Sequence, residues 1–260
     1  MQGPKKGFGI SSKNEIKEEL LLKSKDYELF GVQAPDDMAT TVGVVMEKNK
    51  GYYFCPWDLL QSVVHLGVRV VFLASLNPVN ISLQMKSLDA LVIPDGDFLI
   101  PGEYYAEKVK DRTSARTDML LDCLVEASVN DIKVLGIGRG ALFLAGYAGL
   151  FLTTREFVET PFHHENGCHD IEIEKDSPLY EMFRTPVVKV NSNHTEFLAC
   201  KKLQEERMRS LPLAIYAYAR DGMPEAWGSE NCLGVLWNPE KLAVKGNAFQ
   251  KKIFKWLIIE

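Results

Sequence analysis

The fold is decided by residues 133–143, which read K-V-L-G-I-G-R-G-A-L-F. The apolar run from Val134 to Ile137 has the composition of a buried strand, and glycines alternate with other residues where it ends. A helical run follows from about Ala141. A strand that turns sharply into a helix exposes backbone N–H groups at the helix start, where α/β proteins commonly place an anion or a nucleophile. The residue at the tip of the predicted turn is Gly138, which has no side chain and therefore no reactive atom.

The composition places the chain among globular α/β proteins. Its 260 residues are 46% hydrophobic and 25% charged, which is enough material for one large domain. The net charge of −5 argues against general nucleic-acid binding, which needs a basic face. No apolar run approaches the length of a membrane span, and the first residues lack the apolar core of a signal peptide. We therefore expect a cytoplasmic protein with no nucleic-acid or membrane partner, and with reduced cysteines because the five lack paired spacing.

Strands and helices alternate in the first half of the chain. This rhythm predicts right-handed crossovers and a mostly parallel sheet with helices on both faces. Strands are expected at 41–46, 68–73, 88–93 and 134–137, with helices at 57–66, 115–128 and 141–147, and with a polar turn at 47–51.

The second half changes to short alternating runs, which predict an antiparallel extension at one edge of the sheet. These runs are 170–173, 187–190, 213–220, 225–227 and 233–237, and a C-terminal helix is expected within 247–259. Ser12 and Glu15 have capping-box spacing, so a helix is also expected from there to about Phe30. The predicted organisation is an N-terminal extension with a helix, residues 1–38, followed by one domain, residues 39–260.

Four stretches then carry a resemblance to a known family. Asp89–Gly96, with Pro101 and Tyr104 after it, resembles D-G-L-L-x-P-G-G…P-x-x-Y, and Val134–Gly140 resembles the nucleophile elbow P-V-L-G-I-C-R-G. Val190–His194 resembles V-N-S-x-H, and Asp221–Ala226 with Leu233–Glu240 resembles D-G-x-I-E-A…L-G-V-Q-W-H-P-E. Together they are similar to a class I glutamine amidotransferase-like domain, in its γ-glutamyl-γ-aminobutyrate hydrolase (peptidase C26) branch. This resemblance implies a flavodoxin-like, three-layer α/β sandwich.

The family's chemistry uses a Cys-His-Glu triad, in which a thiolate attacks a γ-glutamyl amide and the histidine transfers the proton. On this chain Gly138 stands at the cysteine position and Asn238 at the histidine position, while Glu240 matches the glutamate. Glycine offers no nucleophile, and asparagine is no general base near neutral pH. The sequence therefore predicts a pseudoenzyme without a cofactor.

The resemblance also implies a ligand site at the vacated elbow. It is expected to include Asp95, Gly96, Arg139, Gly140 and His194. The helix start and Arg139 carry positive charge, whereas Asp95 and Glu240 carry negative charge. Separated charges of this kind favour a small amino-acid-like or γ-glutamyl ligand, and a protein partner is the alternative.

Two other functions stay open. A relocated nucleophile, Cys168 or Cys232, would work with His194, His164 or His169 as an active γ-glutamyl amide hydrolase. The spacing Gly136-Ile-Gly138-Arg-Gly140-Ala141 also matches the G-x-G-x-x-A fingerprint of a nucleotide-binding Rossmann-like protein. No metal is expected, because His163, His164 and His169 are interpreted as part of a polar loop.

Overall fold

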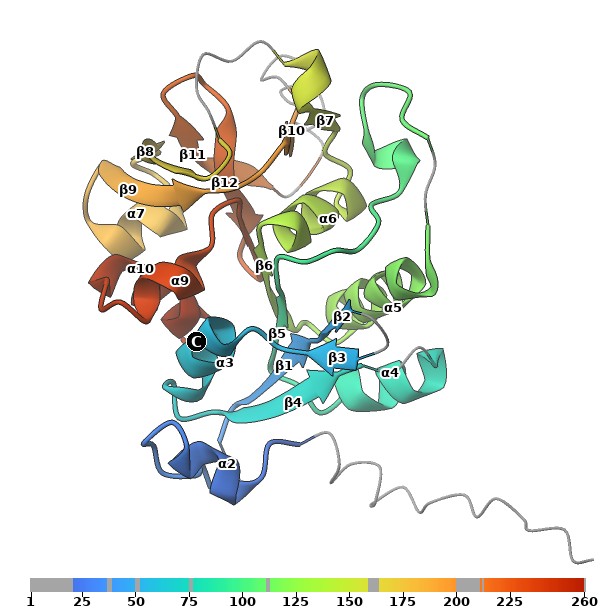
Figure 1. Cartoon of the computed structure of the whole chain (residues 1–260), viewed down its shortest axis with the longest axis vertical. Helices are drawn as coiled ribbons and strands as arrows, with labels where there is room; N and C mark the ends of the chain where they lie inside the picture. Colours follow the sequence, from blue (N-terminus) through green and yellow to red (C-terminus); the bar gives the residue numbers. More distant parts are fainter. Residues whose placement is uncertain are drawn as a thin grey trace, which may run out of the picture.

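The computed structural model describes residues 21–36, 39–49, 52–74, 77–110, 113–158, 164–199, 211 and 213–259. Within these residues a nine-stranded sheet forms the centre of the molecule, in the order β4-β1-β5-β6-β13-β12-β11-β8-β9 (Figure 1). The first five strands in this order are parallel to their neighbours. They are β4 (Arg69–Leu73), β1 (Thr41–Val45), β5 (Ala90–Ile93), β6 (Lys133–Ile137) and β13 (Cys232–Val235).

The remaining four strands pair antiparallel and extend the sheet at one edge. They are β12 (Pro224–Ser229), β11 (Ala214–Ala219), β8 (Gly167–Ile173) and β9 (Val187–Ser192). The predicted mostly parallel centre with an antiparallel extension is therefore confirmed.

Helices cover both faces of the sheet, which gives three layers (Figure 1). Alternate residues of β5 show why: Val92 belongs to the apolar core on one face and Leu91 to the core on the other, as the two-residue period of a strand requires. The first face is covered by α3 (Trp57–Val64), α7 (Pro178–Phe183), α9 (Pro239–Ala243), α10 (Ala248–Lys255) and η3 (Trp256–Ile258). The second is covered by α4 (Pro78–Met85), α5 (Ala115–Val129) and α6 (Arg139–Tyr147).

Several short elements differ from the sequence expectations. Residues 47–51 were expected as a turn, but β2 (Glu47–Asn49) and β3 (Tyr52–Phe54) pair antiparallel on either side of 50–51. Helix α4 was not predicted, although Pro78 stands at its start and the side chain of Asn77 accepts a hydrogen bond from Val79 N. The other small elements are η1 (Gly102–Tyr104), η2 (Arg155–Phe157) and a two-stranded sheet of β7 (Leu152–Thr154) and β10 (Glu196–Leu198).

The helix expected up to Phe30 is shorter in its described part. Leu21 and Leu22 are extended along the sheet edge, where Leu22 N donates to Val70 O at 3.0 Å. Only α2 (Ser24–Glu28) is helical, and it lies beside β4 in Figure 1. The edge strand offers unpaired backbone groups, and pairing with them outweighs the local helical pattern. Ser12 and Glu15 lie outside the described residues.

Candidate functional site

The turn between β6 and α6 is built from glycines that pack closely against neighbouring strands. Gly138 has φ 54° and ψ −120°, a conformation that residues with side chains rarely adopt, and its N–H donates to Val235 O at 2.8 Å. A Cβ on Gly140 would lie 2.2 Å from Ile93 O. The helix therefore begins directly against the end of β5, which places Gly138 and the loop after β5 side by side.

The Asp95 side chain occupies the space next to Gly138. A Cβ built on Gly138 would lie 2.6 Å from Asp95 Cγ, closer than real Cβ contacts. Asp95 Oδ1 accepts a hydrogen bond from Arg139 N at 3.0 Å, and Oδ2 accepts one from the Asn238 amide at 3.3 Å. The carboxylate thus binds the helix-start N–H that the resemblance assigns to an oxyanion or ligand.

Asn238 is held in place from three directions. Besides its contact with Asp95, its Oδ1 accepts from Lys241 Nζ at 3.2 Å and its backbone N–H donates to Asn191 Oδ1 at 3.2 Å. The residue is buried and precedes α9. Because both ends of its amide are engaged, Asn238 serves here as a bridge between Asp95 and Lys241.

Glu240 is a buried carboxyl group two residues further on. Burial, together with the charge of Asp95, raises its pKa to about 7, although its backbone amide, Lys241 and Asn238 partly offset this. Its Oε2 has no hydrogen-bond partner among the described residues. A substantial fraction of Glu240 is therefore protonated near neutral pH.

These residues border a cavity of about 450 Å³. Among the described residues that line it, six are acidic and two, Arg139 and Lys241, are basic. Arg139 also faces Glu196, with Nη2 3.4 Å from Oε1. The acidic lining is Glu47, Asp95, Asp97, Glu165, Glu196 and Glu240.

The structure brings most of the sequence-predicted site residues together. Asp95 touches the elbow at Gly138 and hydrogen-bonds Asn238. Gly96, Arg139, His194 and Glu240 line the cavity with them, whereas Gly140 faces the carbonyls that end β5. Lys241, Glu47 and Glu196 also line the cavity but were not predicted as site residues. A single sequence does not show which charged side chains face one cavity in the folded chain.

A second polar cluster lies beside the cavity. The expected polar loop is wrong for His169, which lies within β8, whereas His164 lies in the irregular segment before β8 but is buried; His163 lies outside the described residues. Together with His194 their rings surround the buried carboxylate of Glu225, on β12. The three histidines contact Glu225 because a carboxylate buried inside a protein is stable only beside positive or polar groups. The D-G-x-x-E-A pattern, whose glutamate alternates with apolar residues, was the available signal for Glu225.

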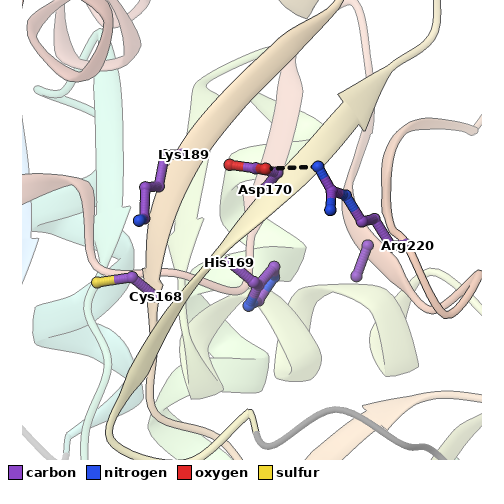
Figure 2. A pocket seen from close by; sticks show the side chains of 6 residues that line it. Cys168, His169, Asp170, Lys189 and Arg220 are labelled. Carbon is purple, nitrogen blue, oxygen red and sulfur yellow. Dashed lines mark hydrogen bonds and ion pairs between the residues drawn. The ribbon is translucent and has the colours of Figure 1, made fainter.

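The two cysteines of the relocated-nucleophile hypothesis differ in setting. Burial raises the pKa of Cys232 to about 12, and its pairing with Val134 places it at the end of the sheet opposite Gly138. Cys168 is exposed and lies beside His169 in a small surface pocket (Figure 2). Within the described part of the chain no hydrogen bond joins Cys168 to a histidine.

The nucleotide-binding alternative meets a competitor at the elbow. A dinucleotide pyrophosphate needs the helix-start N–H groups as donors. Here Arg139 N already donates to Asp95, whose negative charge faces the same position.

No helix in the described ranges is long and apolar enough to cross a bilayer.

This sheet order, with a sharp elbow at the end of a central parallel strand, defines a class I glutamine amidotransferase-like fold. The chain is similar in structure to a putative GMP synthase subunit protein from Thermoplasma acidophilum, with a TM-score of 0.59 and 16% identity over 86% of this chain and 94% of that one. It is also similar to the glutaminase domain of Trypanosoma brucei CTPS with bound acivicin (TM-score 0.59, 14% identity, 84% and 91% covered). A glutamine amidotransferase from Thermotoga maritima gives a TM-score of 0.54 and 12% identity, with 85% and 96% covered.

The particular family follows from the sequence. The Peptidase C26 family model matches residues 29–240, and the chain belongs to this family. No curated protein matches the chain significantly.

Proposed function

We propose that this chain is a non-hydrolysing member of the peptidase C26 family whose elbow is closed by its own carboxylate. The observation that carries the proposal is the position of Asp95. Its carboxylate lies against Gly138 and accepts the Arg139 N–H.

Each part of the acyl-transfer machinery is affected. Gly138 supplies no nucleophile, and Asn238 has no basic nitrogen to accept a proton. An oxyanion hole stabilises negative charge with free N–H donors. Here a negative carboxylate is bound in that place, so a developing oxyanion would lose a donor and be repelled.

Activity assays with glutamine and γ-glutamyl amides test this proposal. We expect the purified protein to release ammonia or amine no faster than buffer does. Thiol-dependent turnover that disappears in Cys168→Ser, but persists in Cys232→Ser, would contradict the proposal and establish a relocated nucleophile. Folding of each variant is checked by thermal unfolding.

For the cavity we propose weak binding of an amino-acid-like ligand, with its amine toward the acidic lining. The cavity's six acidic residues favour the amine, and Asp95 competes with the ligand's carboxylate for Arg139 N. Calorimetry with glutamine should therefore show tighter binding by Asp95→Gly than by wild type. Asp97→Gly is the matched control, because Asp97 lines the same cavity and no hydrogen bond from it to the elbow is present in the described structure. Binding by none of the three proteins would favour a protein partner instead.

A further inference from the structure

Three histidine rings converge on one carboxylate oxygen at the antiparallel edge of the sheet. His164 Nδ1 lies 3.2 Å from Glu225 Oε1, His169 Nε2 lies 3.3 Å from it, and His194 Nε2 lies 3.4 Å from it. The four residues come from the segment before β8, from β8, from the segment after β9 and from β12. The cluster therefore joins parts of the chain that are far apart in sequence.

The converging atoms are buried, yet they lack hydrogen-bond partners. The Glu225 side chain is fully buried, and the side chains of His164 and His194 are 1% and 7% exposed. Neither carboxylate oxygen of Glu225, nor any of the three converging ring nitrogens, forms a hydrogen bond of acceptable geometry within the described structure. A buried carboxylate without hydrogen bonds is unfavourable, so this arrangement calls for a cation or a proton between the oxygen and the ring nitrogens.

His164 and His194 each make a hydrogen bond on the side of the ring that faces away from Glu225. In the neutral ring this bond holds the proton, so the other nitrogen presents a lone pair to the Glu225 carboxylate. His164 Nε2 lies 2.9 Å from Asp221 Oδ2 and therefore donates to it, which leaves Nδ1 as an acceptor in the neutral ring. His194 Nδ1 lies 3.1 Å from the carbonyl of Glu196, which leaves Nε2 as an acceptor. Both lone pairs then face a carboxylate. A cation between them resolves the repulsion, and carboxylate or carbonyl partners on the outer nitrogen are typical of metal-ligating histidines.

The distances from Glu225 Oε1 match those in a tetrahedral metal site. Zinc bonds to histidine nitrogen and carboxylate oxygen of about 2.0–2.1 Å imply ligand-to-ligand separations of about 3.4 Å in a tetrahedron. The observed separations from Glu225 Oε1 are 3.2 Å, 3.3 Å and 3.4 Å. Ligand atoms of His164, His169 and Glu225 also lie within 4.8 Å of one another, and His194 joins them through its distance to Glu225 Oε1.

We propose that His164, His169 and Glu225, with His194 as the fourth ligand, bind a divalent transition metal of the zinc class. Imidazole nitrogens with one carboxylate form a donor set that such ions favour over magnesium or calcium. A site with four protein ligands is of the closed, structural kind, and it would tie β12 to the start of β8 and to the segment after β9.

A surface pocket of about 220 Å³ lies beside the cluster. Its lining includes His169, whose side chain is 11% exposed (Figure 2). On the rim, Arg220 Nη2 pairs with Asp170 Oδ2 at 2.8 Å. The Cys168 sulfur points away from the His169 ring in this view, which fits a ligand set without sulfur.

A proton could occupy the same place. Burial lowers the pKa of His164, but the adjacent carboxylates of Glu225 and Asp221 outweigh it and raise the pKa above the ordinary value. For Glu225, burial raises the pKa, but the three histidines outweigh burial and lower the pKa well below its ordinary value. An imidazolium–carboxylate network without metal is therefore the rival arrangement, and the experiment separates the two.

The test uses the full chain after removal of metal with a chelator. Titration with Zn²⁺ should give one equivalent bound, and Co²⁺ should give a tetrahedral d–d spectrum without a thiolate charge-transfer band. Zn²⁺ should also raise the melting temperature. Metal binding should weaken as the pH falls, because protons compete with the metal for the imidazole nitrogens. A protein that binds no stoichiometric Zn²⁺ or Co²⁺ overturns the proposal in favour of the proton network.

Matched variants locate the site. His169→Ala should weaken Zn²⁺ binding by about tenfold or more, since loss of even an outer partner of a metal ligand costs about 10–100-fold. His65→Ala removes an exposed histidine at the end of α3, and Cys168→Ser removes the neighbouring thiol; both should bind as wild type does. Equal affinity in His169→Ala and wild type contradicts the proposal. If His169→Ala fails to fold, His169→Gln makes the same comparison with a side chain of similar size, and unchanged Zn²⁺ affinity in it contradicts the proposal.

Discussion

At the scale of single residues, the Asp95 carboxyl group lies where a side chain at position 138 would begin, with 2.6 Å between its Cγ and a Cβ built on Gly138. A cysteine at 138 and an aspartate in this rotamer exclude each other. The glycine at 138 and the acidic residue in the turn after β5 are therefore linked by packing. The glycine at 138 avoids a clash with Asp95, and Asp95 supplies the acceptor for Arg139 N.

A double-mutant cycle on these two positions measures the link. Gly138→Ala should lower the free energy of unfolding in both backgrounds, because the backbone conformation with φ 54° costs a side-chain-bearing residue about 1–3 kcal/mol. In wild type the clash with Asp95 adds to this, so the loss should be at least about 1 kcal/mol larger than in Asp95→Gly. Denaturant unfolding gives both values. Equal losses would show that Asp95 moves aside without cost.

The buried Glu240 makes stability depend on pH in a defined direction. Its pKa is raised from 4.5 to about 7, so the folded chain binds more protons than the unfolded chain between these values. Its contribution to stability is therefore fully present below about pH 4.5 and is lost as the pH rises toward and past 7. The penalty at pH 8 is on the order of 3 kcal/mol.

Glu240→Gln removes this penalty while keeping the side-chain volume. We expect the variant to be more stable than wild type at pH 8, with a difference that shrinks toward pH 5. The difference between the two proteins is the quantity to measure by denaturant unfolding, because other titrating groups largely cancel in it. A difference that grows as the pH falls would contradict the raised pKa.

At the scale of elements, Tyr27 fastens the segment before β1 to the edge strand β4. Its hydroxyl donates to Val68 O at 2.9 Å and accepts from Val70 N at 3.1 Å, and the side chain is buried. Tyr27→Phe leaves both backbone groups without this partner and should lower the free energy of unfolding by about 1–3 kcal/mol. Tyr52→Phe on β3 is the control; Tyr52 is 77% exposed and should change stability little. Equal effects in both variants would show that water replaces the Tyr27 hydroxyl.

At the scale of the whole molecule, the boundary of the domain is the open question. The sequence predicts an extension at 1–38, but residues of 21–36 pack on the core of the main sheet. A chain that begins at residue 39 should therefore be less stable than one that begins at residue 21, by at least about 3 kcal/mol, since Tyr27 and its hydrogen bonds are lost. Equal stability would support the boundary at 38/39. Unfolding of the two shortened chains makes the comparison.

The sequence by itself determined the fold class, because periodic apolar runs and glycines report on the local backbone. The alternation of strands and helices predicted the parallel centre, the short alternating runs predicted the antiparallel edge, and the glycines around position 138 predicted the strand-to-helix turn. The motifs also predict which reactive groups are absent at 138 and 238. Local patterns suffice for these features, since strand period and positive φ are properties of neighbouring residues.

Only the tertiary structure decided what lies against Gly138 and where the histidines gather. Asp95 reaches Arg139 and Asn238 across 44 and 143 positions of sequence, and His164 reaches Asp221 across 57. Contacts between residues so far apart in sequence depend on the order of the strands in the sheet. They also depend on which side chains face one another once the chain is packed. A single sequence carries no direct record of either, so the closed elbow and the histidine–glutamate cluster emerge only once the chain is folded.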